Sequence, residues 1–108
     1  MWDMTIHFLY FEGCPHSKET RAHLEEALTR LGLEDVPVQE VRIENQEDAE
    51  RWRFPGSPTI LVDGKDLVTG REPEEVGFTC RVYHLGGKTT GVLPVDVIVE
   101  RLASFLPR

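Results

Sequence analysis

The chain has 108 residues and a formal net charge of −7, and 40% of its residues are hydrophobic. This length and composition favour a single folded domain over residues 1–108 rather than a disordered chain. The acidic balance and the lack of a basic cluster exclude nucleic acid and anionic membrane surfaces as expected partners. Two cysteines are too few for a disulfide scaffold, and no apolar run reaches the roughly 20 residues of a membrane span.

The N-terminus has neither the basic start nor the cleavage site of a signal peptide, so we expect a cytoplasmic protein. In that compartment permanent disulfides are rare, which favours free thiols at both cysteines. No motif in the sequence calls for a cofactor, and we expect none.

The first half of the chain predicts alternating strands and helices. Residues 4–11 form an apolar run typical of a buried strand, and residues 15–31 follow with a helical apolar stripe. Residues 36–44 predict a second strand. Asn45 is a suitable N-cap for a short second helix, which the Pro-Gly pair at 55–56 ends.

The second half predicts a hairpin and a last helix. Residues 59–62 read as a third strand, and a tight turn then leads into a return strand that begins over 65–68. Alternating apolar residues indicate a strand over 78–84, residues 86–91 predict a loop, and residues 94–106 predict a helix. The order β-α-β-α-β-β-α predicts an α/β fold with a four-stranded mixed sheet flanked by helices, in which the first two strands are parallel.

The most informative motif is Cys14-Pro15-His16-Ser17, between the first predicted strand and the first predicted helix. At such a position helix N–H groups and the helix dipole stabilise a thiolate, and a protonated His16 adds a positive charge. We therefore expect Cys14 to be a nucleophile, with a merely buried cysteine as the alternative. Ser17 stands where a Cys-x-x-Cys motif has its second sulfur. It can donate a hydrogen bond to the thiolate or cap the helix, but it cannot attack a disulfide.

Together with Gly56-Ser57-Pro58-Thr59 ahead of the third strand, this motif resembles the thioredoxin-like superfamily. The nearest resemblance is to short bacterial thioredoxin- and glutaredoxin-like proteins with a monothiol Cys-x-x-Ser motif. It implies a thioredoxin-like fold with a cis Pro58 beside the reactive Cys14. It also implies that Pro15, Ser57 and Thr59 contact substrate, and that backbone groups near Cys14 pair with an extended substrate chain.

The chain lacks several motifs of the superfamily that it resembles, and their absence limits the activities that we expect. The chain lacks the second motif cysteine and the glutathione-binding pattern of glutaredoxins. It also lacks the Cys-Gly-Phe-Ser motif of monothiol glutaredoxins that carry clusters, which argues against iron–sulfur chemistry.

Cys80 is the internal candidate for a resolving thiol. If residues 78–84 pair with residues 59–62, Cys80 lies roughly 10 Å or more from the active-site edge. A disulfide requires Cα atoms within about 7 Å, so this topology keeps the cysteines apart. If residues 66–80 fold over Cys14 as a lid, the two cysteines can pair.

These features predict a monothiol thiol–disulfide oxidoreductase that acts on protein or low-molecular-weight disulfides through Cys14. The alternative is a redox-inactive thioredoxin-like binding module that holds a partner segment in a groove beside Pro58. A carrier of a metal or soft ligand, with Cys14, His16, Cys80 and His84 as ligands, is a weaker hypothesis.

Overall fold

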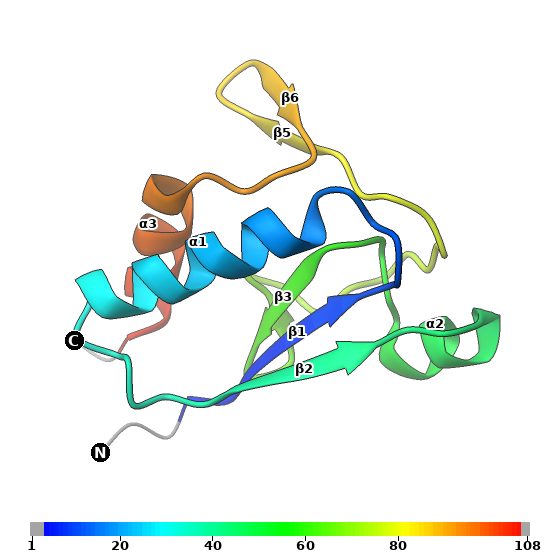
Figure 1. Ribbon diagram of the computed structural model, residues 1–108, viewed down its shortest axis with the longest axis horizontal. Coiled ribbons are helices and arrows are strands. Elements are labelled where there is room, and N and C mark those ends of the chain that lie inside the picture. The colour runs from blue at the N-terminus through cyan, green and yellow to red at the C-terminus, as the bar shows by residue number, and fades with distance from the viewer. Residues whose placement is uncertain (1–3, 107–108) are drawn as a thin grey trace.

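The computed structural model describes residues 4–106, which form three helices, a four-stranded sheet and a two-stranded hairpin (Figure 1). The mixed α/β class and the four-stranded mixed sheet predicted from the sequence are confirmed. The elements in chain order are β1 (Ile6–Tyr10), α1 (Ser17–Arg30), β2 (Val38–Arg42), α2 (Gln46–Trp52), β3 (Thr59–Val62), β4 (Lys65–Asp66), β5 (Tyr83–Leu85), β6 (Lys88–Thr90) and α3 (Val95–Phe105).

The main sheet has the strand order β2-β1-β3-β4. β1 runs parallel to β2, as the sequence predicts, and antiparallel to β3. The turn between β3 and β4 consists of Asp63 and Gly64, with φ of 53° and 83°. Two successive residues with positive φ form the primed turn that matches the twist of a hairpin, so this dipeptide sets the register of β4.

The helices begin and end at residues that favour those roles. The Asn45 side chain accepts a hydrogen bond from the Asp48 N–H at 2.8 Å, which confirms it as the N-cap of α2. α1 is followed by Gly32 at φ 70°, a conformation that glycine adopts at helix ends without steric cost. Pro15 lies before the N-cap residue His16, and so outside the helix that it was expected to open. No helix within residues 4–106 is long and apolar enough to cross a bilayer.

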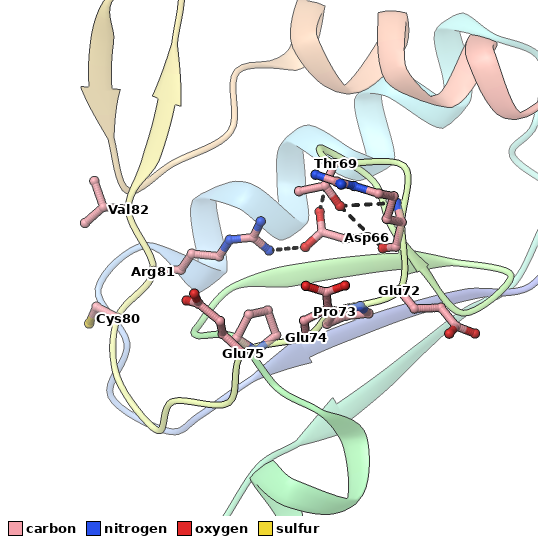
Figure 2. A pocket seen from close by; sticks show the side chains of 11 residues that line it. Asp66, Thr69, Glu72, Pro73, Glu74, Glu75, Cys80, Arg81 and Val82 are labelled. Atoms are coloured by element: carbon pink, nitrogen blue, oxygen red, sulfur yellow. Dashed lines mark hydrogen bonds and ion pairs between the residues drawn. The ribbon is translucent and has the colours of Figure 1, made fainter.

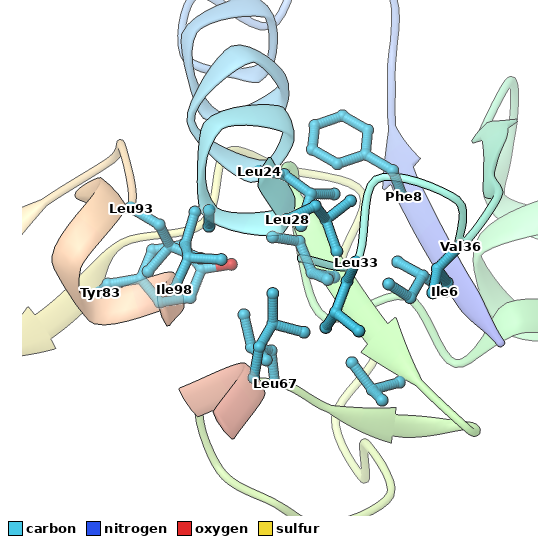
Figure 3. Packing of buried hydrophobic residues seen from close by; sticks show 14 residues of the cluster. Ile6, Phe8, Leu24, Leu28, Leu33, Val36, Leu67, Tyr83, Leu93 and Ile98 are labelled. Carbon is cyan, nitrogen blue, oxygen red and sulfur yellow. The ribbon is translucent and has the colours of Figure 1, made fainter. Parts of the chain in front are cut away.

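Two apolar clusters lie on opposite faces of the sheet, because neighbouring side chains on a strand point to opposite sides. Phe8 of β1 belongs to the larger cluster, between the sheet and the packed pair α1 and α3 (Figure 3). Leu9 belongs to the smaller one, with Ala49 of α2 and Phe54. Figure 1 shows α1 and α3 together on one side of the sheet. Burying a large side chain such as Phe8, Leu9 or Phe54 stabilises the fold by about 1.5–3 kcal/mol.

The chain after β4 differs from the sequence prediction. β4 takes the place beside β3, so residues 78–84 form no strand of the main sheet. Cys80 instead makes a single bridge to Ser57, and the strand begins only at β5. The predicted loop over 86–91 is also wrong. Gly86 and Gly87 have φ of 56° and 81° and form the turn of the β5–β6 hairpin, which projects beyond α1 in Figure 1.

Candidate functional site

Cys14 lies in the turn between β1 and α1, against the segment that leads into β3. Its side chain is 7% exposed, and its thiol donates a hydrogen bond to the Ser57 carbonyl at 3.6 Å. The peptide bond between Ser57 and Pro58 is cis, as the resemblance implies. The fold therefore brings together the two motifs that the sequence singled out, although 43 positions separate Cys14 from Ser57.

His16 and Ser17 shape the start of α1. His16 is the N-cap residue, and its ring lies against Gly91, where an added Cβ would be 2.3 Å from the imidazole Cδ2. The Ser17 hydroxyl donates to the Cys14 carbonyl at 3.2 Å. Of the two roles left open for Ser17, this contact fits a structural role at the helix start, because the hydroxyl proton is directed to the backbone and not to the sulfur.

The residues on either side of Cys80 are hydrogen-bonded to the backbone of Ser57. The Ser57 N–H donates to the Thr79 carbonyl at 2.9 Å, and the Arg81 N–H donates to the Ser57 carbonyl at 2.8 Å. This is strand-type pairing, and it uses the backbone groups that were expected to receive a substrate chain. The side chains of Ser57 and Thr59 are fully buried, so in this arrangement they contact the protein's own chain, while Pro15 is exposed.

The pairing brings Cys80 to Cys14. Although the Cys80 side chain is exposed, the protein atoms that partly bury it raise the pKa of its thiol, and the charge and hydrogen bonding of Cys14 raise this pKa further. The topology that would separate the cysteines does not occur, because β4 fills the position beside β3. The two cysteines therefore lie close enough to interact in this structure.

We expect the neighbouring Cys14 to add to the effect of burial on the pKa of Cys80. Because its pKa is raised, Cys80 should stay protonated at neutral pH and become rapidly alkylated only above the ordinary value of 9.0. In Cys14→Ala this rise in rate should move to lower pH, since the charge of Cys14 is lost while the burial remains. Residue-resolved iodoacetamide labelling from about pH 6 to pH 11 measures the shift. Identical profiles in the two proteins would contradict it.

Arg81 anchors the segment on the side of β4. Its guanidinium donates to the Asp66 carboxylate at 2.5 Å, and the two side chains are 14% and 4% exposed. It also donates to the Thr59 hydroxyl at 3.1 Å and lies 4.3 Å from the centroid of the Tyr83 ring. Figure 2 shows Arg81 directed to Asp66 and the Cys80 sulfur directed away from this pair. Neighbouring residues of an extended segment point to opposite sides, so the anchor also orients the thiol.

The sequence patterns do not point to Arg81, Asp66 or Tyr83 as part of the site. Arg81 and Asp66 lie 15 positions apart, and no local periodicity joins them. Their one signal in the sequence is indirect. Arg81 follows Cys80 in a segment whose alternating apolar pattern predicts a strand over residues 78–84.

Tyr83 secures the segment at the cis proline. Its hydroxyl donates to the Pro58 carbonyl, and its ring is part of the larger apolar cluster (Figure 3). Burial is the main cause that raises the pKa of Tyr83 well above its ordinary value of 10.0. The folded protein therefore keeps this proton at a pH where the unfolded chain loses it. The contribution of Tyr83 to stability is complete below pH 10.0 and declines as the pH rises above it.

Tyr83→Phe is expected to lower the free energy of unfolding by about 1–3 kcal/mol, because the buried Pro58 carbonyl loses its donor. Urea denaturation at neutral pH measures this loss, with Tyr10→Phe as the matched control on a half-buried tyrosine. The variant should also lose the part of the alkaline destabilisation that Tyr83 causes. Unchanged stability of Tyr83→Phe would contradict the contact.

A pocket of about 520 Å³ lies on the other side of the segment, beside the ion pair (Figure 2). Its acidic rim comes from Glu72, Glu74 and Glu75, and Arg71 also lines it. Cys80 and Val82 also line this pocket. The exposed Phe78 ring lies edge-on to Phe11, with centroids 5.4 Å apart, and lines a different pocket together with Glu12, Arg42 and Glu44.

The ligand set considered for a metal carrier does not come together. Within residues 4–106, no three His, Cys, Asp or Glu side chains are grouped so that they could hold a metal ion. His84 lies in the β5–β6 hairpin, where its Nδ1 contacts the Thr89 hydroxyl at 3.3 Å. Comparison of the chain with protein-family models, with curated proteins and with solved structures finds no match.

Proposed function

We propose that this protein is a thioredoxin-like thiol–disulfide oxidoreductase in which Cys14 is the nucleophile and Cys80 is the resolving thiol. One observation carries the proposal: pairing of Thr79 and Arg81 with Ser57 holds the Cys80 thiol beside Cys14. The motif alone favours a monothiol enzyme that depends on an external thiol. A second thiol at the site supplies that step from within the chain.

The proposed cycle consists of two exchange steps. The Cys14 thiolate attacks one sulfur of a disulfide, so that a mixed disulfide forms and one substrate thiolate leaves and is protonated. The Cys80 thiolate then attacks the Cys14 sulfur, forming a Cys14–Cys80 disulfide and releasing the second substrate thiol. The two cysteines supply the two electrons that reduce the substrate. A dithiol reductant, itself oxidised to a disulfide, returns the protein to its starting state.

The different surroundings of the two thiols support this order of steps. Cys14 lies two residues before the N-cap of α1, at the position where the motif predicts the nucleophile. The raised pKa of Cys80 keeps that thiol protonated at neutral pH and makes it the poorer first nucleophile. Cys80 attacks only once a mixed disulfide has formed next to it.

The alternative function, a redox-inactive binding module, needs an open groove beside Pro58. In this structure the Arg81 N–H is bonded to Ser57 and the Tyr83 hydroxyl to Pro58. No observation favours a partner segment at a position that the protein's own chain fills.

The test is release of thiol from hydroxyethyl disulfide by the fully reduced protein. We expect one protein molecule to release both thiols of the disulfide, and addition of a dithiol reductant to make the reaction catalytic. The Cys14→Ser variant should not exceed the rate of the reductant alone. Thiol release by the wild-type protein no faster than by free cysteine at the same concentration would contradict the proposal.

A further inference from the structure

We infer that this site takes small disulfides and excludes extended polypeptide chains. The inference rests on the proposed function. It starts from the backbone of Ser57, the position at which an extended substrate would add as a strand. Both its N–H and its carbonyl are already bonded, to Thr79 and Arg81. A polypeptide substrate would have to displace this segment before it could pair there.

The segment is anchored on both sides of Cys80. Before it, the Gly77 N–H donates to the Phe54 carbonyl at 2.8 Å. After it, the Arg81 guanidinium is paired with the buried Asp66, and the Tyr83 hydroxyl is bonded to Pro58. Displacement breaks these contacts together and leaves the Asp66 carboxylate buried without its cation, which a substrate backbone cannot replace.

No room remains for a second chain between the segment and the residues ahead of β3. A Cβ added to Gly56 would lie 2.9 Å from the Arg81 Cβ and 3.1 Å from the Arg81 Cα. Real Cβ atoms do not approach other atoms so closely, so the two backbones are in direct contact here. A substrate chain has no space to insert at this point while the segment stays in place.

Cys14 is far less exposed than the segment around Cys80. Phe78 and Val82 lie two positions on either side of Cys80. They are 40% and 51% exposed, whereas Cys14 is 7% exposed. The low exposure of the Cys14 sulfur favours small substituents on the attacked disulfide.

The experiment compares two uncharged disulfides with the reduced wild-type protein. One is hydroxyethyl disulfide, and the other is the disulfide-linked dimer of an uncharged, extended peptide of about 10 residues. Each second-order rate is divided by the rate of free cysteine with the same disulfide, which removes intrinsic reactivity. We expect the normalised rate to be at least about 100-fold lower for the peptide.

The possible results of this experiment test the substrate class and the proposed function separately. If the peptide disulfide reacts as fast as hydroxyethyl disulfide, the inference is overturned while the oxidoreductase function stands. If neither disulfide reacts faster with the protein than with free cysteine, the proposed function fails and the inference fails with it.

A variant then tests whether the anchor sets this selectivity. Asp66→Asn combined with Arg81→Ala removes the ion pair without leaving a buried charge, and it should raise the relative rate of the peptide at least about tenfold. Arg71→Ala, in the same pocket, is the control and should leave the ratio unchanged. A folded double variant that keeps the wild-type ratio would overturn the assigned cause. If circular dichroism shows it unfolded, the wild-type comparison still decides the substrate class.

Discussion

Cys14→Ser is expected to abolish disulfide exchange, whereas Cys80→Ser is expected to stop the cycle after its first step. A serine hydroxyl cannot attack a disulfide under these conditions, so the first variant loses the nucleophile itself. The second variant keeps Cys14 and should accumulate a mixed disulfide, with one substrate group bound to Cys14. Intact-protein mass spectrometry after one addition of hydroxyethyl disulfide distinguishes the two products.

The pair of variants also shows how the proposal would fail. Steady turnover by Cys80→Ser equal to that of the wild-type protein would mean that an external thiol completes the cycle. A substrate adduct that forms first on Cys80 in the wild-type protein would reverse the proposed order of attack. Peptide mapping of the adduct locates it at one cysteine or the other.

Arg81→Ala is expected to lower the free energy of unfolding by about 3–5 kcal/mol. The reason is the carboxylate of Asp66, which is 4% exposed and would lose its cation while it stays buried. The double variant Asp66→Asn with Arg81→Ala should lose less, because no charge is left in the interior. Guanidinium denaturation of both variants measures the difference.

Arg71→Ala is the matched control for this loss, since Arg71 is an exposed arginine that lines the same pocket. Substitutions at such surface positions change stability by within about 0.5 kcal/mol. If Arg81→Ala destabilised the protein no more than Arg71→Ala, the ion pair would not anchor the segment around Cys80. The inferred exclusion of polypeptide substrates would then lose its physical basis.

The parts of the fold that were predicted from the sequence carry local signals. Asn45 caps α2, Gly32 follows α1, and Asp63-Gly64 turns β3 into β4. In each case the residue type required by the backbone is found at the position where the element begins or ends. The apolar patterns between these points then place the strands and helices in the right order.

The region after β4 could not be predicted in the same way. The pairing of Ser57 with Thr79 and Arg81 joins residues more than 20 positions apart. No local sequence pattern in either segment predicts this pairing. The alternation over 78–82 is real, but it belongs to an extended segment beside the site and not to a strand of the main sheet. β6 is a three-residue strand of Lys88, Thr89 and Thr90, too short and polar to show a period.

The candidate site could also be predicted only in part. The resemblance of its two motifs implied that Cys14 and Pro58 lie together, and in the structure Cys14 contacts Ser57, the residue before the cis Pro58. The position of Cys80 was left between two alternatives, because it depends on which segment pairs beside β3. The ion pair of Arg81 and Asp66, which fixes that position, depends on side chains that meet only in the folded chain.

The most direct test of the proposed site is peptide mapping of the wild-type protein after mild oxidation with hydrogen peroxide. We predict one intramolecular disulfide that joins Cys14 to Cys80, formed in monomeric protein and removed by a dithiol reductant. Cys80→Ser, treated in the same way, should show no such link. Recovery of the wild-type protein with both thiols free, or with each cysteine oxidised separately, would contradict the proposal that Cys80 resolves Cys14.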